Sequence, residues 1–535
     1  MKQKLLSILA LLCLTVTSAW ADGSWTSGSC TVTLTGGTLT VSGTGAMADY
    51  GWSNQPEWLA SHTNENPSPI TQITIESGVT HIGNYAFYWC NNANLTSVSI
   101  PSSVVTIGES AFCACTYLTS VTIGSGVTTI GYSAFNGCSG LTTIEIPANV
   151  TSIGNSAFNN CPALTTVTFA AGSLLTTIGN SAFYSCSNLS SINIPDHVTS
   201  IGGSAFQNTK FSSIDIPASV TNIETHAFYA CSYLEAINVN ADNTVYASED
   251  GVLFNKAKTT LIKYPQAKSG SSYSIPATVT SIEIAAFMDC TNLTTVTIPA
   301  SVTNIDNNVF FGCSNLATVN FNSNPNIGSN VFYGIANGAT VSMNLTGNQG
   351  ATGEYWMTFY NQNYNFQVPA TGTQIFKAAL DGSALTLTEL TTDKIITKNN
   401  AVILKSTSGP IALTLTTTDS ENDFSENSLS GVSSASGLSG NGSIYVLNYK
   451  AATGAGFYKL ATGKKVGVGK AYLTYSGGAG AREFFGFEEP TGIDATLNDN
   501  GEIINDNCYD LQGRRVTNPT KGIYIVNGKK VFINK

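Results

Sequence analysis

The stretch VTTIGYSAFNGC, residues 127–138, decides the fold of this chain because close variants of it recur along the sequence. Their shared form is V-T-x-I-G-x-x-A-F followed by x-x-C. The phenylalanines of successive copies are Phe87, Phe112, Phe135, Phe158, Phe183, Phe206, Phe228, Phe287, Phe310 and Phe332. A repeat this short cannot bury its own apolar face, so the copies must stack into one continuous core. The sequence therefore predicts a solenoid, with function on its surfaces rather than in a pocket.

Each copy predicts the same local structure. The segment V-x-I alternates apolar and polar residues, which is typical of a short strand with one buried face, so each copy should add one parallel strand. Proline follows many of these strands and ends them, because it cannot donate a ladder hydrogen bond. The segment I-G-x-x-A-F-x-x-C predicts a tight turn in which glycine permits an unusual backbone angle. We expect a mainly β solenoid of about ten 22–25-residue repeats over residues 70–345.

One interval interrupts the repeat, since 59 residues separate Phe228 from Phe287. Two apolar stretches around polar turns predict a hairpin insert at about residues 240–272, and the pattern resumes at Tyr273. We therefore expect the insert to decorate the rod without breaking it. Four lysines lie here, namely Lys256, Lys258, Lys263 and Lys268. They indicate either a solubilising exposed hairpin or a contact site for an acidic partner.

Composition excludes nucleic acid as a partner of the repeats. Only 10% of the residues are charged, against about 25% in an average soluble domain, and the formal net charge is -10. No arginine precedes Arg482, and Lys210 is the only lysine between Asp22 and Asn255. Phosphate neutralisation needs a basic stripe, which the repeats lack.

The N-terminus has the form of an export signal. Lys2 and Lys4 precede an apolar run from Leu5 to Val16, and Ala19-Trp20-Ala21 has the small-x-small form of a cleavage site. The sequence predicts that residues 1–21 are a signal peptide and that the protein is secreted or lies at the outer cell surface. No other segment has the 18 or more apolar residues of a membrane span, so we expect no transmembrane segment.

Eight cysteines each follow a repeat phenylalanine by three residues and should form a structural ladder. They are Cys90, Cys115, Cys138, Cys161, Cys186, Cys231, Cys290 and Cys313. The exported context allows disulfides. Stacked neighbours should instead point in parallel, and Thr209 and Ile335 take the same position in two copies, which favours buried free thiols acting as small apolar fillers.

With the phrase repeated about ten times, residues 70–345 resemble the leucine-rich repeat surface proteins of the BspA, or treponemal, type found in bacteria. Residues 37–50 and Trp58 resemble the segment that precedes the first repeat in that family, and residues 22–69 should cap the first strand. The resemblance implies adhesion to host extracellular proteins or to other bacteria. It supplies no catalytic residues.

Two C-terminal segments resemble parts of exported proteins of Bacteroidetes. Residues 346–490 have the alternating patterns and glycine-rich turns of an all-β sandwich-like domain. Residues 491–535, with Tyr509–Val516 and Lys521–Val526, resemble a C-terminal sorting tail of type IX secretion. That resemblance implies a small β module recognised by the export machinery. The alternative is an ordinary final hairpin.

The sequence shows no residues in a pattern typical of catalysis or metal binding. None of the four histidines neighbours an Asp and Ser motif or a cysteine at ligand spacing. The chain contains no phosphate-binding Gly-Lys-Ser/Thr loop, no H-E-x-x-H and no G-x-S-x-G. We therefore expect no enzyme, no cofactor and no metal site.

Aromatic residues gather around the A-F-x-x-C turns, whereas the outward strand positions carry small polar and acidic residues. Protein-binding hot spots favour Trp, Tyr and Arg, so the turns are the better candidates for ligand contact. The candidates are Tyr85, Tyr88, Trp89, Tyr132, Tyr184 and Tyr229. The first three should form the main anchor for a protein or glycan; the alternative is half-buried packing.

These observations favour a non-enzymatic secreted or cell-surface adhesin that binds host extracellular proteins or other cells. Two other functions stay open. Planar aromatics beside polar rows also suit a glycan-binding accessory protein, and a repetitive rod also suits a structural component of a surface layer or matrix.

Overall fold

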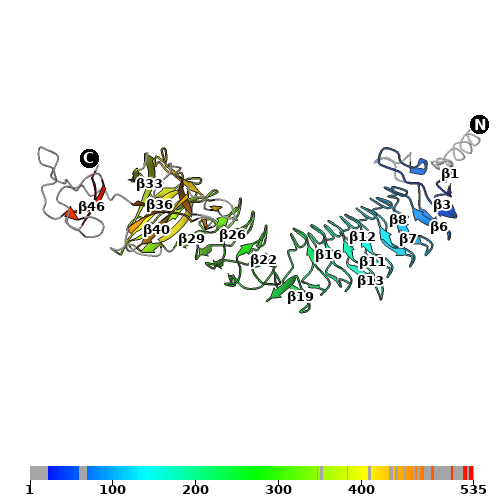
Figure 1. Ribbon diagram of the computed structural model, residues 1–535. Helices are drawn as coiled ribbons and strands as arrows, with labels where there is room; N and C mark the ends of the chain where they lie inside the picture. Colours follow the sequence, from blue (N-terminus) through cyan, green and yellow to red (C-terminus); the bar gives the residue numbers. More distant parts are fainter. Residues whose placement is uncertain are drawn as a thin grey trace, which may run out of the picture.

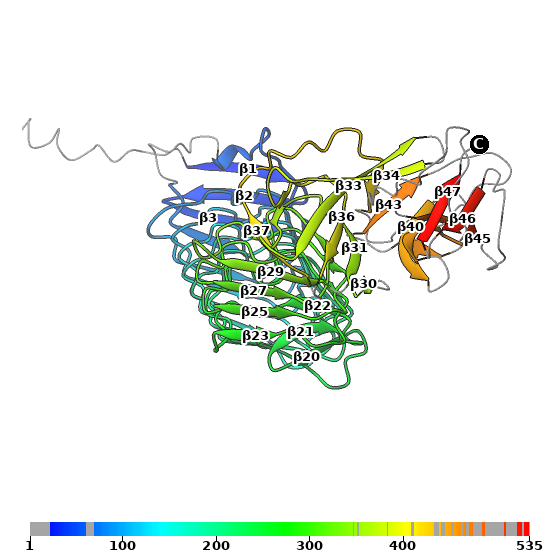
Figure 2. The same ribbon diagram turned by 90° about the vertical axis from the view of Figure 1, so that its left-hand side faces the viewer.

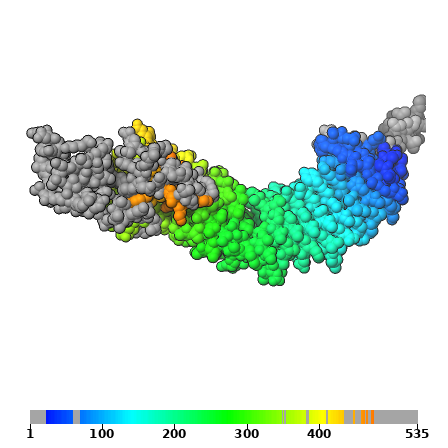
Figure 3. Space-filling model, in the orientation of Figure 1, coloured from blue at the N-terminus to red at the C-terminus, as the bar shows by residue number. Residues whose placement is uncertain are grey.

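The protein is an elongated, gently curved rod with antiparallel sheets at its C-terminal end (Figures 1 and 3). The computed structural model describes residues 22–59, 69–345, 347–349, 353–381, 384–407, 411–432, 438–439, 444–450, 454–461, 464–466, 470–474, 484–486, 508–509, 522–526 and 529–533. The predicted signal peptide lies outside these residues. So does most of the predicted sorting tail.

Each turn of the rod contributes two strands, one to each of two parallel-stranded faces; we call them long and short because most have four and two residues respectively. The long strands are β5 (Gln72–Ile75), β7 (Ser97–Ile100), β9 (Ser120–Ile123), β11 (Thr143–Ile146), β13 (Thr166–Phe169), β15 (Ser191–Ile192), β17 (Ser213–Ile216), β19 (Ala236–Val239), β23 (Ser272–Ser274), β25 (Thr295–Ile298), β27 (Thr318–Phe321) and β29 (Thr340–Leu345). The second face comprises β4 (Gly45–Ala46), β6 (Val79–Ile82), β8 (Thr106–Ile107), β10 (Thr129–Ile130), β12 (Ser152–Ile153), β14 (Thr177–Ile178), β16 (Ser200–Ile201), β18 (Asn222–Ile223), β22 (Thr260–Lys263), β24 (Ser281–Ile282), β26 (Asn304–Ile305) and β28 (Asn326–Ile327). Equivalent residues of successive repeats pair, as Ile130 does with Ile153.

The core is a column of equivalent side chains. The repeat phenylalanines stack ring on ring: centroids of Phe112 and Phe135 lie 5.3 Å apart, and Phe158 lies 5.4 Å from both Phe135 and Phe183. The interplanar angles of these pairs are 5° or less. Isoleucine and valine of the strands bury their side chains on either side of this stack. The predicted mainly β solenoid of parallel strands is confirmed, with about eleven turns.

The turns correct one expectation. Positive φ angles occur two residues before and two residues after the phenylalanine, for example at Ser133 (51°) and Gly137 (73°). The glycine of I-G does not have a positive φ. A Cβ on Gly154 would instead lie 2.6 Å from the carbonyl carbon of Gly131, so this glycine permits close stacking of repeats and not an unusual angle.

Backbone groups of the turns form three columns of hydrogen bonds that all run in one direction along the rod. The N–H groups of Ser133, Phe135 and Gly137 donate to carbonyl oxygens of the next turn at 2.8–2.9 Å. The acceptors are the carbonyls of Asn155, Ala157 and Asn159. Each turn therefore offers N–H groups toward the C-terminal end of the rod and needs a following turn to accept them.

The threonine of V-T also connects neighbouring repeats. Thr151 Oγ1 donates to the carbonyl of Thr128 at 3.2 Å, and Thr176 Oγ1 donates to that of Thr151 at 3.0 Å. A second column is formed by the threonines that directly precede the long strands, where Thr142 Oγ1 donates to the carbonyl of Thr119 at 3.2 Å. These exposed hydroxyls therefore donate their hydrogen bonds to backbone carbonyls of the preceding repeat.

Both ends of the solenoid sheet are covered. At the N-terminal end, the antiparallel strands β1 (Gly23–Ser27), β2 (Cys30–Thr35) and β3 (Thr38–Gly43) add to the sheet through β3, which pairs with β5. The 3-10 helix η1 (Glu57–Leu59) buries Trp58, whose Nε1 donates to the carbonyl of Ala86 at 2.8 Å. At the other end, β29 pairs antiparallel with β37 (Ile411–Thr416), as Figure 2 shows.

Antiparallel sheets follow the solenoid, as predicted. The solenoid sheet continues through β37 into β32 (Asn365–Gln367) and β35 (Ile395–Ile396). One five-stranded sheet comprises, in order, β30 (Asn348–Gln349), β31 (Tyr355–Phe359), β36 (Val402–Ser406), β33 (Thr373–Asp381) and β34 (Ala384–Glu389). A second comprises β38 (Leu429–Gly431), β43 (Ala471–Thr474), β40 (Ile444–Lys450), β41 (Gly454–Lys459) and β44 (Phe484–Gly486). Smaller sheets comprise β39 (Leu438–Ser439) with β42 (Lys465–Val466), and β45 (Cys508–Tyr509) with β46 (Gly522–Val526) and β47 (Lys529–Ile533). The last repeats share one apolar core with Met357 and Phe366.

The insert breaks the solenoid sheets, contrary to expectation. Strands β20 (Tyr246–Glu249) and β21 (Val252–Asn255) form the predicted hairpin, but this hairpin is the start of a new sheet, which continues through β22, antiparallel to β21. The short-strand sheet of the first repeats ends at β18. Strand β21 pairs with β22 on the edge where a regular repeat would pair with β18, and the described apolar core falls into two clusters, one in each half of the rod.

Each of the four lysines of the insert contacts a neighbouring group, although Lys256 is exposed and Lys258 lies in an exposed ion pair. Lys258 and Lys268 pair with Glu249 and Asp250 at 2.5 and 2.8 Å. Lys256 Nζ donates to the carbonyl of Ala241 at 3.0 Å. Lys263 is the exception in its burial, because only 8% of it is exposed and its Nζ donates to the carbonyl of Ala285 at 3.2 Å.

Asn243 attaches the insert to the first half of the rod. It is fully buried, and its Nδ2 donates to the carbonyls of Pro217 and Val220 at 2.9 Å. Its Oδ1 accepts from the N–H groups of Val245 and Tyr246 at 2.9 and 2.7 Å. One side chain therefore satisfies four backbone groups of two segments.

Candidate ligand-contact surface

An aromatic surface lies on the first repeat turn, where the N-terminal cap meets it. Tyr85, Tyr88 and Trp89 come from this turn, and Trp52 comes from the cap. The Trp52 ring meets the Tyr88 ring edge-on with centroids 5.5 Å apart, and Tyr85 lies 5.5 Å from Tyr88. Trp52 is 68% exposed, and the other three are partly exposed. We call these four residues the aromatic edge.

Two of these aromatics occupy backbone positions that disfavour large side chains. Tyr85 and Trp89 have φ angles of 56° and 60°. A left-handed conformation costs a residue with a Cβ roughly 1 kcal/mol or more, and it is uncommon for bulky residues. The same turn positions carry Ser133, Gly137, Ser156, Asn160, Ser181 and Ser185 in later repeats. The fold therefore does not require aromatic residues here.

The phenols of the aromatic edge are hydrogen-bond donors at neutral pH. Burial raises the pKa of Tyr85 and of Tyr88 above the ordinary value for tyrosine. The Tyr85 hydroxyl donates to Glu109 Oε1 at 3.2 Å, which fixes its ring against the next turn. Tyr88 packs partly against the core, so it combines a packing contact with an accessible face.

Of the six predicted contact residues, the structure brings Tyr85 and Tyr88 into ring contact, and Trp89 directly follows Tyr88 in the same turn. Tyr132 is 52% exposed but lies two repeats from Tyr88. Tyr184 and Tyr229 occupy the same turn position as Tyr88, four and six repeats further along, or roughly 20 and 30 Å at about 4.8 Å per strand. These three are separate features of the rod rather than parts of one surface.

Sequence reasoning missed Trp52, because its contact with Tyr88 depends on how the cap folds over the first turn. The Gly51-Trp52 pair carried no repeat signal. A second missed pair is Phe311 and Tyr333, whose rings stack at 5.0 Å with Tyr333 65% exposed. The signal for that pair was present, since both residues directly follow a repeat phenylalanine.

The eight cysteines of the predicted ladder are buried free thiols in the structure. Most of them donate a hydrogen bond to the carbonyl of the phenylalanine in the preceding repeat, at Sγ to oxygen distances of 2.9–3.3 Å. Examples are Cys138 with Phe112 and Cys313 with Phe287. The thiol is thus a donor as well as a small filler.

The folded protein should resist thiol alkylation. Burial raises the pKa of Cys138, and it raises that of Cys313 to about 12, so little thiolate is present at pH 8. We expect iodoacetamide at pH 8 to leave all eight ladder cysteines unmodified in the native protein and to modify all eight after denaturation without reductant. Peptide mass spectrometry gives the count. Disulfide-linked ladder peptides would contradict this prediction.

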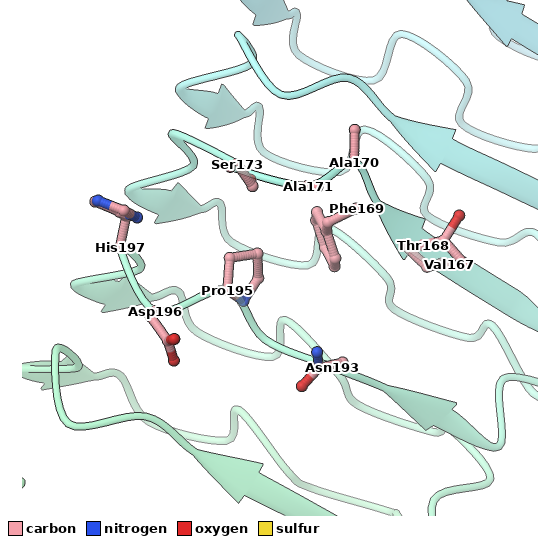
Figure 4. A pocket seen from close by; sticks show the side chains of 11 residues that line it. Val167, Thr168, Phe169, Ala170, Ala171, Ser173, Asn193, Pro195, Asp196 and His197 are labelled. Atoms are coloured by element: carbon pink, nitrogen blue, oxygen red, sulfur yellow. The ribbon is translucent and has the colours of Figure 1, made fainter.

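The described residues line at least two cavities, whereas the sequence predicted function on the surfaces rather than in a pocket. The larger, about 430 Å³, lies beside β13, where the repeat is two residues longer than its neighbour. Figure 4 shows Phe169 facing Pro195 across it, with Asp196 and His197 pointing away. The smaller, about 300 Å³, lies at the insert and includes Tyr229 in its wall.

Within the part of the chain that the structure describes, no group of three or more His, Cys, Asp or Glu residues is arranged to hold a metal ion. Among the same residues, no helix has the length and apolar character needed to cross a membrane.

A sequence profile described as "BspA type Leucine rich repeat region", in six copies, matches residues 60–174, 170–269 and 264–386. Among solved structures, a leucine-rich repeat protein from Eubacterium ventriosum is 26% identical over 61% of this chain and 79% of its own, with a TM-score of 0.39. A leucine rich cell surface protein from Faecalibacterium prausnitzii is 31% identical over 56% of this chain and 76% of its own, also with a TM-score of 0.39. The pneumococcal vaccine antigen PcpA is 22% identical over 59% of this chain and 82% of its own, with a TM-score of 0.38. No curated protein matches. Because the profile covers more than half of the sequence, the chain belongs to the BspA-type leucine-rich repeat family.

Proposed function

We propose that this protein is a non-enzymatic adhesin, secreted or held at the outer cell surface, whose solenoid binds host extracellular proteins or other cells through the aromatic edge. One observation carries the proposal. Tyr85, Tyr88 and Trp89 of the first repeat turn gather beside Trp52 of the cap, and the positions of Tyr85 and Trp89 carry Ser133, Ser156, Gly137 and Asn160 in later repeats. Membership of a family of repeat proteins found on bacterial surfaces supports it.

The aromatic edge has the physical character of a protein-binding hot spot. Tryptophan and tyrosine dominate such sites because they bury a large area at a small cost in side-chain entropy. Trp52 and the phenol of Tyr85 are held in place by contacts with Tyr88 and Glu109. The surface is therefore organised before a partner arrives, which lowers the entropic cost of binding.

The two ends of the sequence complete this proposal. Residues 1–21 would direct export, and residues 491–535 would serve as the tail that the type IX export machinery recognises. The support is the resemblance of Tyr509–Val516 and Lys521–Val526 to such tails. An ordinary final hairpin is the alternative for the tail.

A triple variant tests the aromatic edge. Tyr85→Ser, Tyr88→Asn and Trp89→Asn together replace each aromatic by a residue that the same turn position tolerates elsewhere. The precedents are Ser133, Asn136 and Asn160. We expect at least tenfold weaker attachment to immobilised extracellular-matrix proteins and to fixed host cells, with an unchanged melting temperature. Loss of hot-spot residues costs about 2 kcal/mol or more each, which exceeds tenfold in affinity.

The matched control removes two exposed tyrosines elsewhere. Tyr117→Asn with Tyr233→Asn takes away two exposed aromatic rings, and Asn188, Asn292 and Asn315 occupy the same position in other repeats. Attachment should not change. Equal attachment by the triple variant and the wild type would refute the role of the aromatic edge. Binding to a glycan array but not to proteins would favour the glycan-binding alternative, and silence in both would favour a structural component.

A further inference from the structure

The second cavity lies where the insert leaves one turn of the rod incomplete. A regular repeat takes five residues to pass from Ile130 to Phe135. The insert passes from Leu261 to its equivalent, Tyr264, in three. These equivalences follow from pairing, because Leu261 lies opposite Ile282, and Tyr264 N–H donates to Ala286 as repeat phenylalanines do. In Figure 1 the regular stack of turns is interrupted here, between β16 and β22.

The short turn leaves backbone donors without acceptors. One repeat earlier, the N–H groups of Ser204, Phe206 and Asn208 all donate to the next turn at 2.9–3.2 Å. The equivalent N–H groups of His226 and Phe228 have no acceptor among the described residues, and both residues line the cavity of about 300 Å³. Unpaired N–H groups at a cavity wall favour a ligand that supplies oxygen acceptors.

The lining also carries charges of both signs. Lys263 donates one of its three ammonium protons to Ala285, and it is 8% exposed. Glu283 is half-buried and has no hydrogen-bond partner among the described side chains; burial, with the nearby Asp306, raises its pKa. Glu224, also in the wall, accepts from Gly203 N–H at 3.1 Å.

Neutral polar and apolar groups complete the lining. His226 lies edge-on to Tyr229 at 5.8 Å, and burial, followed by the charge of Lys263, lowers its pKa, so its ring is neutral at pH 7 and offers one donor and one acceptor. Ile262 and Ile284 supply apolar surface. The cavity therefore combines donors, acceptors and an apolar patch within a small volume.

We propose that this cavity binds a single neutral sugar residue. Glu224 and Glu283 would repel an anion. Lys263 and the free N–H groups would repel a cation. A sugar hydroxyl accepts from the N–H groups and Lys263 while it donates to the carboxylates, and the C–H faces of the ring suit the isoleucines. The volume lies at the small end of the roughly 300–1,000 Å³ range of ligand pockets, which fits one ring. The site is independent of the aromatic edge.

A variant at the rim tests the site without disturbing the core. Thr225 is exposed, lines the cavity and takes the turn position that Tyr132 takes in another repeat, so Thr225→Tyr should fold and fill the opening. Ser329→Tyr is the matched control, because Ser329 takes the same exposed position in a repeat away from the cavity. Melting temperatures of both variants report on folding.

Saturation-transfer NMR with the full chain provides the readout. The probes are methyl glycosides of glucose, galactose, mannose and N-acetylglucosamine. Acetate, methylammonium and an end-blocked trialanine peptide serve as comparison ligands that represent an anion, a cation and a peptide. We expect at least one glycoside to bind, with an at least tenfold loss in Thr225→Tyr and no change in Ser329→Tyr. Lys263→Met should also weaken binding.

The arms of this experiment separate the possible outcomes. Binding of a free glycoside with no response on a glycan array would assign the site to a monosaccharide, whereas responses to both would assign it to the end of a glycan chain. No glycoside binding, binding that survives Thr225→Tyr, or binding only of acetate, methylammonium or the peptide would each overturn the proposal. None of these results bears on attachment through the aromatic edge.

Discussion

Replacing Phe158 by alanine should lower the free energy of unfolding by about 3–5 kcal/mol. Phe158 is fully buried, and its ring lies 5.4 Å from the rings of both Phe135 and Phe183. The substitution removes apolar area and leaves a cavity between two rings that cannot close, because the hydrogen-bond columns fix the spacing of the turns. Because each repeat contacts only its neighbours, the loss should appear as a weak point within the rod.

Urea denaturation monitored by circular dichroism measures this effect. Phe158→Leu should lose less, because leucine fills part of the space. Tyr132→Ala, which removes an exposed aromatic of the next repeat toward the N-terminus, should change stability by no more than about 0.5 kcal/mol. A loss below about 1 kcal/mol for Phe158→Ala would mean that the stack does not carry the stability assigned to it.

Asn243→Ala should destabilise the protein by about 4 kcal/mol or more. Its amide satisfies two carbonyl and two N–H groups, and the residue is fully buried. Each buried group left unpaired costs about 1–3 kcal/mol. Since Asn243 connects the insert to the repeat of Pro217 and Val220, hydrogen exchange in β20 and β21 should accelerate first.

An exposed asparagine provides the control for Asn243. Asn188 Nδ2 makes one exposed hydrogen bond, to the carbonyl of Pro162 at 2.8 Å, so Asn188→Ala should cost no more than about 1 kcal/mol. Denaturation and hydrogen-exchange mass spectrometry compare the two variants. Similar losses in both, or exchange in the insert that stays slow in Asn243→Ala, would refute the connecting role of Asn243.

The solenoid was predictable from the sequence because its determinants recur. Val, Ile, Phe and Cys each recur at one position of the phrase. Because each position is buried in successive repeats, the same apolar residue recurs there and makes the repeat visible in the sequence. The functions of Thr151 and Gly154 were not predictable, since each depends on a backbone group of the preceding repeat rather than on local sequence. The phrase showed that these residues recur but not why.

The insert and the aromatic edge were harder to predict for a related reason. The sheets break because β21 takes the place beside β22, and the second cavity lies at a turn two residues shorter than the others; both depend on the strands that flank the insert. The burial of Lys263 could have been predicted, because side chains alternate along a strand and Lys263 lies two residues after the buried Leu261 in β22. Trp52 left no signal in the sequence, since the path of the cap decides its position.

The threonine columns also determine how the rod responds to its medium. Among the described residues, the four ion pairs lie in the cap, the insert and the C-terminal sheets, and none joins one regular repeat to the next. The regular repeats are connected by neutral hydroxyl and amide hydrogen bonds, which dissolved ions screen very little. The spacing and length of the regular repeats should therefore stay constant from dilute buffer to molar salt, so side chains along the rod keep their relative positions whatever the ionic strength.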